Sequence, residues 1–594
     1  MTAVASRSSR AAVRVDRRGV ITGLGAGGVA VFLGMIGMLV AFDGRNVIDP
    51  ILSLGYAVLI GVFVVAGHRA AAREELEGVE FEPYGPYDVV SGAVAGIVGG
   101  AVVGGFILLI EAFDVREVFT NVSPALVDFL TLDSGLAVGL IAMALGGAVF
   151  GAVGAATHLL PARVKDSAIS AVIWIFIIGF IELVIVDIVE SFKFADFFED
   201  FVYGDRRGLT VPAALLVGAG VFLLTWRFRG RVVAFRARIQ VMPEEQRRKT
   251  GVVIALVLIA LGAILPAVLG TFVNELLTIV GLFLLMGLGL NIVVGLAGIL
   301  DLGYVAFFAV GAYTTAVLTS PLSPAFSPEL TWFAALPFVI VFAAMAGVLV
   351  GTPVLRMRGD YLAIVTLGFG EIARILFLSD WFKGIFGGAQ GIIQIPSVEI
   401  GPLTIKGTDP QQVFYLLLFF VVIVAYVSWR LQDSRIGRAW IAMREDEQVA
   451  EAMGVNTVTA KLLAFVIGAI MASFGGAIFA AKIGSIFPNS FQFLVSIIVL
   501  VLIIVGGMGS IPGVAVGAFV LVGVLGGPTS PGLLREFAEF KLLIYGTLLV
   551  YMMLKRPEGL LPSARRTREL HQEEYLQDAW IDAQEKEGHP EEDG

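Results

Sequence analysis

The chain has 594 residues, of which 57% are apolar or aromatic and only 15% are charged, and it contains no cysteine. Soluble domains contain about 45–50% apolar and about 25% charged residues, so this excess of apolar side chains requires a lipid environment. The absence of cysteine excludes disulfides, cysteine-bound metal centres and thiolate nucleophiles. The composition therefore predicts a polytopic membrane protein.

The net charge of −9 is concentrated near the C-terminus, where residues 571–594 contain nine acidic side chains and one lysine. The remainder of the chain is close to neutral, so we expect no nucleic-acid partner. The tail, residues 570–594, is poor in core-forming side chains, and we expect it to be disordered. The four histidines are far apart in the sequence, so we expect no bound metal or cofactor.

Sixteen stretches are apolar enough for a helix that crosses a hydrocarbon core of about 30 Å. The first, residues 19–42, follows an arginine-rich start and is too long for the apolar part of a signal peptide, so we expect an uncleaved anchor. The next five lie near residues 51–67, 89–113, 135–160, 168–190 and 209–226. Ten more lie near residues 251–270, 275–298, 303–319, 332–354, 361–379, 411–429, 461–482, 493–507, 511–527 and 541–554.

The connections between these stretches predict the orientation, because basic residues concentrate in cytoplasmic loops. With both termini in the cytoplasm, the basic connections all fall inside: residues 68–73, 163–165, 227–249, 356–358, 430–444 and 555–568. The stretches 493–507 and 511–527 are short and meet at a glycine-rich turn, so we expect broken or re-entrant helices there. The sequence predicts an all-α bundle of about sixteen membrane spans.

A basic linker, residues 226–250, divides the chain. We expect an extension of about six spans in residues 1–249, a ten-span domain in residues 250–569, and the acidic tail. Small residues at helical spacing predict close packing of the third span on the fourth. They are Gly92, Gly96, Gly100 and Gly104 on one span and Gly147, Gly151 and Ala155 on the other.

Charged residues inside spans are costly unless they are paired or hydrated, so each is a functional candidate. We expect Glu182 to pair with a group on another helix, and Asp187 to lie near the outer interface. Glu371 and Arg374 are three residues apart on one helix face, which predicts mutual neutralisation, although such a pair can also line a polar pathway.

Three stretches between residues 250 and 568 resemble the M-type permease subunits of ABC importers for leucine, isoleucine and valine. The first covers residues 287–313, with the polar Asn291 flanked by glycines in an apolar span. The second covers residues 358–372 and the third residues 437–456. The resemblance implies a translocation path that includes Asn291, Gly295, Tyr304, Thr366 and Glu371. Asn291 has an alternative role as a hydrogen-bonding partner of a neighbouring backbone.

The third stretch is charged and too polar to span a membrane. Acidic residues alternate with Val449, Ala450 and Met453, a pattern typical of a short amphipathic helix along the membrane face. It resembles the coupling helix that docks on the ATPase subunits, although Gln448 and Val449 replace the Glu and first Ala of the family's motif. The residues expected to couple to the ATPases are Gly437, Arg438, Arg444, Glu445, Asp446, Ala450, Glu451 and Gly454.

The resemblance also implies partners: two cytoplasmic ABC ATPase subunits, a second permease of the H type and an extracytoplasmic solute-binding protein, all at the lipid bilayer. No lysine follows a glycine, so the chain lacks a G-K-[ST] phosphate loop, and any ATP must be hydrolysed by a partner. We expect no enzyme activity in this chain. The alternatives are a permease for urea or short amides, a proton-coupled secondary transporter that uses Glu182, Asp187 and Glu371, and a membrane scaffold or sensor.

Overall fold

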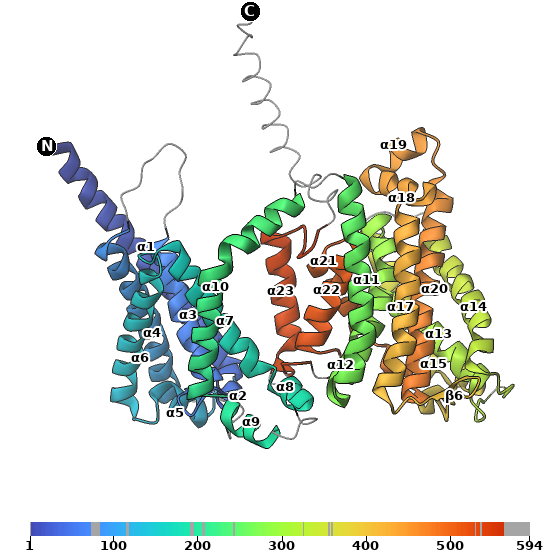
Figure 1. The fold of residues 1–594 in the computed structure, drawn as a ribbon, viewed down its shortest axis with the longest axis horizontal. Coiled ribbons are helices and arrows are strands. Elements are labelled where there is room, and N and C mark those ends of the chain that lie inside the picture. The colour runs from blue at the N-terminus through green and yellow to red at the C-terminus, as the bar shows by residue number, and fades with distance from the viewer. Residues whose placement is uncertain are drawn as a thin grey trace, which may run out of the picture. The chain divides into compact units, whose positions relative to one another are not determined.

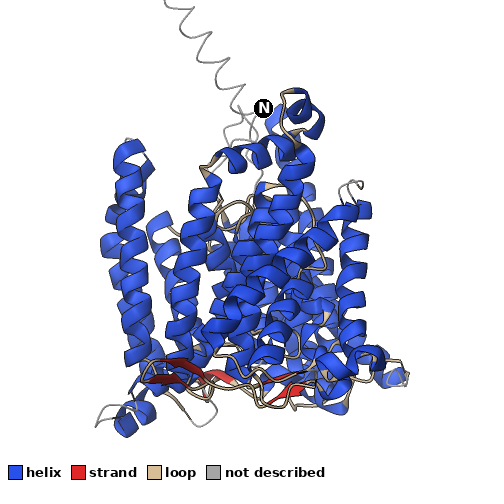
Figure 2. Cartoon of the chain, turned by 90° about the vertical axis from the view of Figure 1, so that its right-hand side faces the viewer, coloured by secondary structure: helices blue, strands red, loops and turns tan. Residues whose placement is uncertain are grey.

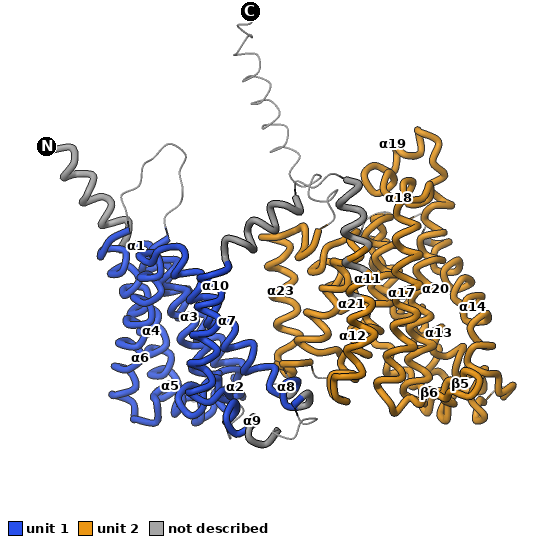
Figure 3. Tube along the Cα trace, viewed as in Figure 1, with its two compact units in different colours: residues 1–250 blue, residues 251–594 orange. Residues whose placement is uncertain are grey.

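The computed structural model describes residues 2–72, 84–113, 118–189, 195–204, 208–240, 244–324, 326–354, 357, 360–528, 530, 532–534 and 537–562. The chain divides into two compact units, residues 1–250 and 251–594 (Figure 3). Helices make up nearly all of both units, and the strands have only two to four residues (Figures 1 and 2). The predicted helical membrane bundle is therefore confirmed. The acidic tail, residues 570–594, lies outside the described residues.

Unit 1 is built from helices and one small sheet. The helices are α1 (Thr2–Met35), α2 (Met38–Asp43), α3 (Leu54–Ala71), α4 (Pro86–Ala112), α5 (Pro124–Thr131), α6 (Leu136–Ala156), α7 (Ala162–Phe180), α8 (Glu182–Val189), α9 (Ala195–Val202) and α10 (Val211–Gln240). The sheet has the order β2-β1-β3 and contains β1 (Asn46–Asp49), β2 (Leu52–Ser53) and β3 (Leu209–Thr210). Strand β1 pairs antiparallel with β2 and parallel with β3. Helix α10 continues beyond its apolar stretch, so the predicted linker is partly helical.

Helices α4 and α6 approach so closely that their backbones touch. A Cβ atom on Gly96 would collide with the carbonyl of Gly147, and one on Gly92 would lie 2.6 Å from the carbonyl oxygen of Gly151. Glycine has no Cβ, so a ladder of glycines lets two helices pack backbone to backbone. The predicted packing of the third span on the fourth is confirmed.

The predicted span 168–190 is interrupted at Ile181, where α7 ends and α8 begins. Glu182, the first residue of α8, forms an ion pair with Arg45, with Nη2 and Oε2 3.6 Å apart. Arg45 also donates a hydrogen bond to the carbonyl of Gly179 at 2.8 Å. The side chains of Arg45 and Glu182 are only 6% and 12% exposed, so this pair compensates a buried charge. Glu182 is paired as predicted, although its partner Arg45 lies between α2 and β1 and not on a helix. The side chain of Asp187 lies outside the described residues.

Unit 2 contains the remaining elements. Its α-helices are α11 (Glu244–Val268, which begins just before the unit boundary), α12 (Thr271–Leu290), α13 (Val305–Thr319), α14 (Trp332–Val354), α15 (Asp360–Leu378), α16 (Lys383–Phe386), α17 (Pro410–Gln432), α18 (Arg435–Glu445), α19 (Glu447–Ala452), α20 (Thr457–Ile483), α21 (Phe493–Gly506), α22 (Ile511–Ala518) and α23 (Lys541–Lys555). Two π-helices, η2 (Asn291–Leu296) and η6 (Phe519–Leu525), continue α12 and α22. Short 3₁₀ turns are η3 (Asp380–Phe382), η4 (Gly388–Gln390) and η5 (Pro488–Phe491). Two antiparallel pairs join β4 (Ile392–Ile393) to β7 (Ser485–Ile486) and β5 (Val398–Ile400) to β6 (Leu403–Ile405).

Helices α12 and α20 form the centre of unit 2. In the most apolar part of α12 and η2, 89% of the residues are buried, and α20 packs against α12, α13, α14 and α17. The hydroxyl of Ser473 on α20 donates to the carbonyl of Phe307 on α13 at 2.7 Å, and the indole of Trp332 on α14 donates to Ala477 at 3.0 Å. These bonds satisfy polar groups that would otherwise be unpaired in an apolar core.

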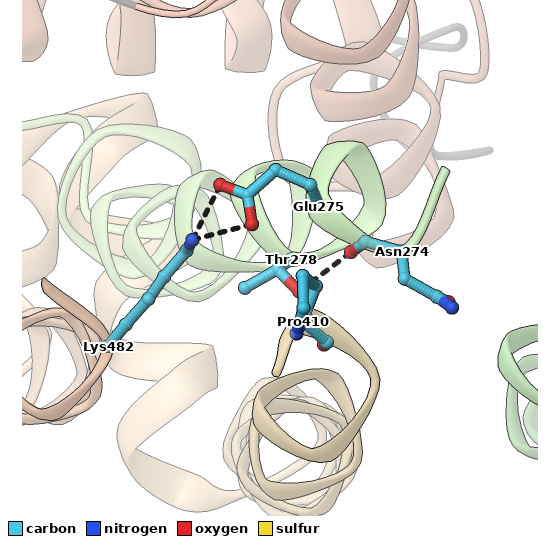
Figure 4. A network of polar contacts seen from close by, with 5 residues as sticks. All are labelled: Asn274, Glu275, Thr278, Pro410 and Lys482. Carbon is cyan, nitrogen blue, oxygen red and sulfur yellow. Dashed lines mark hydrogen bonds and ion pairs between the residues drawn. The ribbon is translucent and has the colours of Figure 1, made fainter. Parts of the chain in front are cut away.

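At one end of unit 2, an ion pair links the start of α12 to the end of α20 (Figure 4). Lys482 Nζ lies 2.6 and 2.8 Å from the two carboxylate oxygens of Glu275. One helical turn further along α12, the hydroxyl of Thr278 donates to the carbonyls of Asn274 at 2.8 Å and of Pro410 at 3.2 Å. Together these contacts fasten α12, α17 and α20 to one another.

Among the described residues, eleven helices are long and apolar enough to cross a membrane, and they coincide with eleven of the sixteen predicted spans. The other five predicted spans are α7 with α8, α11, α13, α22 with η6, and α23. Helices α13 and α23 have 15 residues each, and several side chains in the apolar stretch of the 25-residue helix α11 lie outside the described residues. The difference between eleven and sixteen therefore comes from helices that are short, interrupted or only partly described.

Candidate functional site

The third sequence stretch folds into two short helices, α18 and α19, which project beyond the ends of α17 and α20 (Figure 1). We call residues 435–454 the α18–α19 segment. Each helix starts at a side-chain cap: Ser434 accepts from the N–H of Gly437 at 3.1 Å, and Asp446 accepts from the N–H of Gln448 at 2.8 Å. Such caps satisfy the free N–H groups of a first helical turn, so the chain restarts at Asp446 instead of continuing as one helix.

One face of the α18–α19 segment is anchored to α20. Trp440 is fully buried, and its indole N–H donates to the carbonyl of Ala460 at 2.7 Å. Lys461, whose side chain is 8% exposed, forms an ion pair with Glu447 at 2.5 Å. A Cβ atom on Gly437 would collide with the carbonyl of Leu431, so glycine allows the tight turn between α17 and α18.

The opposite face of the segment is exposed and carries both apolar and acidic groups. Met453 is 81% exposed and Val449 is 58% exposed, and the side chains of Glu445 and Glu451 around them are also exposed. The sequence predicts a short amphipathic helix that contains Val449 and Met453, and the structure has Val449 in the short helix α19 and Met453 directly after it. The chain breaks at Asp446 between α18 and α19, and an orientation along the membrane face stays a prediction.

The eight predicted coupling residues therefore divide between the two faces. Gly437 and Ala450 are buried and Arg444 is half-buried. The exposed ones are Arg438, Glu445, Asp446, Glu451 and Gly454. Gly454 has a φ of 88°, in the left-handed region that glycine adopts without strain, and it ends α19 before α20 begins.

Arg444 points away from the exposed face and towards α12. Its Nη1 donates to the carbonyl of Gly295 in η2 at 2.6 Å. Gly298, with a φ of 71°, lies beside it, and a Cβ atom there would be 2.6 Å from Arg444 Cγ. The absence of a side chain at Gly298 thus leaves the space in which the arginine passes.

Comparison with known proteins shows what this fold is related to. Residues 272–553 match the family described as "Branched-chain amino acid transport system / permease component". The high-affinity branched-chain amino acid transport system permease protein LivM of Escherichia coli (strain K12) is 40% identical over 329 residues, which cover 52% of this chain and 74% of the relative. The chain belongs to this permease family.

Further relatives of the permease fall into two groups. A LivM permease protein of Salmonella typhimurium is 42% identical over 312 residues, covering 49% of this chain and 70% of the relative. A LivH permease protein of Escherichia coli (strain K12) is 26% identical over 290 residues, covering 47% and 91%. No solved structure matches the chain. The predicted resemblance to the M-type permeases is confirmed, and residues 1–271 precede the matched region.

Four of the five residues predicted to line a path in the permease are buried within unit 2. Asn291 is 4% exposed, and its Oδ1 accepts from the N–H of Gly509 at 2.8 Å. The hydroxyl of Tyr304 donates to the carbonyl of Gly468 at 2.7 Å, and the hydroxyl of Thr366 accepts from the N–H of Leu302 at 3.0 Å. The buried Gly295 lies beside Asn291. These bonds correspond to the alternative role named for Asn291, and path lining stays a prediction for all four.

The fifth residue, Glu371, is 33% exposed and forms an ion pair with Arg374, with Oε2 and Nε 2.9 Å apart. The predicted neutralisation within this pair is confirmed. Glu371 lies on α15 (Asp360–Leu378), whereas Asn291 and Gly295 lie on η2. The structure thus brings Asn291 and Gly295 together and leaves Glu371 at a partly exposed position of its own.

Asp301, in the loop between η2 and α13, is a buried carboxyl group whose role sequence reasoning did not address. It is 1% exposed, and its Oδ1 accepts from the N–H of Gly303 at 2.9 Å, while Oδ2 has no hydrogen-bond partner among the described residues. Burial raises the pKa of Asp301 to about 7, and the hydrogen bonds from Gly303 and Thr366 only partly oppose this rise. The signal in the sequence was an acidic residue between two apolar spans.

Proposed function

We propose that the chain is the M-type permease subunit of an ATP-driven ABC importer for branched-chain or similar small amino acids. Membership of the permease family and 40% identity with a LivM permease protein support this proposal. The chain would form half of the translocation path, and a second permease of the H type would supply the other half. LivH permease proteins match the same chain more distantly, as expected for two related subunits that pair.

The proposal that this chain couples to ATPase subunits rests on the exposed face of the α18–α19 segment. Val449 and Met453 form an exposed apolar pair with acidic side chains around it, on a segment that is itself anchored to α20. Exposed apolar groups with a polar rim are typical of protein–protein contacts, and methionine adapts well to a partner's groove. We propose that this face docks on one of the two cytoplasmic ATPase subunits of the complex, and that both termini of the chain are cytoplasmic.

In this assembly the chain binds no cofactor, and the partner ATPases bind and hydrolyse ATP. An extracytoplasmic solute-binding protein would deliver the amino acid to the opposite side. The domain boundaries at residues 249 and 569 are likewise proposals, with residues 1–249 as an added membrane region and residues 250–569 as the permease domain. The ion pairs of Glu182 with Arg45 and of Glu371 with Arg374 favour this proposal over proton coupling through those carboxylates.

The first test is co-purification with the full-length chain as bait. We expect two P-loop ATPases and a second permease to remain bound, and the reconstituted complex to accumulate leucine, isoleucine or valine only with ATP and the binding protein. Competition by urea or short amides would change the substrate class. Recovery of the chain alone, with uptake driven by a proton gradient, would overturn the proposal in favour of a secondary transporter.

A second test addresses the docking face directly. Replacing Val449 and Met453 together by serine should reduce ATPase recovery about tenfold or more, because two exposed apolar contacts are lost at the centre of the interface. Leu403→Ser removes a comparably exposed apolar side chain, 56% exposed in β6, and should leave ATPase recovery unchanged. Equal recovery with both variants would remove the docking role from this face.

A further inference from the structure

Arg444 belongs to the last turn of α18, but it does not share the exposed face of the α18–α19 segment. Its guanidinium reaches the carbonyl of Gly295 near the C-terminal end of η2 at 2.6 Å. The last carbonyls of a helix lack donors from their own helix, and a charged donor forms a stronger bond than a neutral one. Arg444 thus joins the segment to the end of the α12–η2 helix, at the centre of unit 2.

Gly295 lies beside a second hydrogen bond, which joins Asn291 to Gly509. A Cβ atom on Gly295 would collide with Asn291 Oδ1 and would lie 2.7 Å from the amide nitrogen of Gly509. Asn291 Oδ1 accepts from that same N–H group at 2.8 Å. Gly509 lies in the turn between α21 and α22 and has a φ of 77°. The end of η2 and this turn are therefore held together by one buried bond.

A third hydrogen bond joins the α21–α22 turn to α17, the helix that precedes the α18–α19 segment. Gln432, the last residue of α17, donates from Nε2 to the carbonyl of Gly509 at 2.8 Å. Both polar backbone groups of Gly509 are thus bound, one by Asn291 and one by Gln432. The contacts form a closed ring that runs from α18 through η2 and the α21–α22 turn to α17 and back. We call its members the Arg444 ring: Gln432, Arg444, Gly295, Asn291 and Gly509.

We propose that the Arg444 ring transmits movement of the α18–α19 segment to η2 and to the α21–α22 turn, and that Arg444 is a positioning residue for transport. The inference rests on the proposed function, because the movement would come from the docked ATPases. The hydrogen bond of Trp440 and the ion pair between Glu447 and Lys461 join the segment to α20 instead. The ring instead reaches a π-helix, a local change of hydrogen-bond register that is frequent at functional sites.

The test measures leucine transported per ATP hydrolysed by the complex in proteoliposomes. Arg444→Gln should leave ATPase recovery and hydrolysis near the wild-type level and lower the transport ratio about tenfold or more, since it removes the charge-assisted bond to Gly295. Arg444→Lys keeps the charge and should restore part of the ratio. The matched control is Arg430→Gln, which removes an exposed arginine from the last turn of α17, outside the α18–α19 segment, and should change neither quantity.

Asn291→Leu opens the ring from the other side without touching the α18–α19 segment. It should lower the same transport ratio. The double variant with Arg444→Gln should have a ratio no lower than that of the more severe single variant, because both changes interrupt the same set of hydrogen bonds. A wild-type ratio in Arg444→Gln would overturn the proposal, as would multiplicative losses in the double variant. A proportional loss of hydrolysis and ATPase recovery would place Arg444 in the docking surface instead. If Arg444→Gln fails to fold, Arg444→Lys and Asn291→Leu decide by the same ratio.

The experiment separates this proposal from the proposed function. If ATPases fail to bind even the unmodified chain and Arg430→Gln, the importer assignment fails. If they bind and hydrolyse ATP but the ring variants transport normally, only the transmission role fails.

Discussion

Replacing Gly96 by alanine gives a test of the backbone contact between α4 and α6. The added Cβ would collide with the carbonyl of Gly147, so the two helices would have to separate by about an ångström. Overpacking of this kind costs about 1–3 kcal/mol. Alanine is also the better helix former, by about 1 kcal/mol, which offsets part of that cost. Because the colliding group is a backbone carbonyl that cannot rotate away, the cost falls in the upper part of that range, about 2–3 kcal/mol, and we expect a net loss of about 1–2 kcal/mol in the free energy of unfolding.

The control is Gly105→Ala on the same helix, because no atom lies within 4 Å of a Cβ at that position. There the helix propensity acts alone, and we expect a gain of about 0.5–1 kcal/mol. The two variants should thus shift the thermal unfolding midpoint of the purified full-length protein in detergent in opposite directions. Shifts of the same sign and size would refute the argument that close backbone packing decides the residue at Gly96.

Two further predictions concern charges in unit 2. The pKa of Asp301 is raised from 3.8 to about 7, so its contribution to stability, at most about 4 kcal/mol, is present below its unfolded pKa and is lost as the pH rises through 7. The thermal midpoint should therefore fall between about pH 4 and about pH 7 in the wild type and less in Asp301→Asn, and parallel pH profiles would contradict this. At the ion pair in Figure 4, Glu275→Gln should lower the free energy of unfolding by about 1–2 kcal/mol more than Lys482→Met does. Glu275→Gln leaves the charge of Lys482 unpaired at 8% exposure, whereas Lys482→Met leaves the charge of Glu275 unpaired at 42% exposure. A larger cost for Lys482→Met would contradict the argument that the buried charge is the expensive one.

The features that the sequence predicted well are those set by neighbouring residues. The glycine ladder of α4 has a four-residue spacing, which defines a helix face without knowledge of the rest of the fold. The same holds for Glu371 and Arg374, which are three residues apart. The helical fold class follows from apolar stretches alone, because backbone groups in lipid must be satisfied within a helix.

Contacts between distant residues could not be predicted in the same way. Asn291 and Gly509 are 218 positions apart, and Arg444 and Gly295 are 149 positions apart. In each pair one partner uses a backbone group, which leaves no trace in the identity of its residue. The break of the α18–α19 segment at Asp446 had a local signal, an aspartate that can cap a new helix, but the sequence prediction of a short amphipathic helix did not use this signal.

The hydrogen bonds that Asn291, Tyr304 and Thr366 form within unit 2 bear on which of the predicted path residues can line a translocation path. A residue that lines a path shared with a second permease must be accessible on the isolated subunit, since the partner covers it only in the complex. Asn291, Tyr304 and Thr366 are at most 4% exposed and bonded to backbone groups of unit 2, whereas the side chain of Glu371 is 33% exposed. Of the predicted path residues, Glu371 is therefore the one whose side chain is partly accessible, and path lining stays a prediction for it as well. The buried polar groups instead fix how η2, α13, α15 and α20 are held against one another.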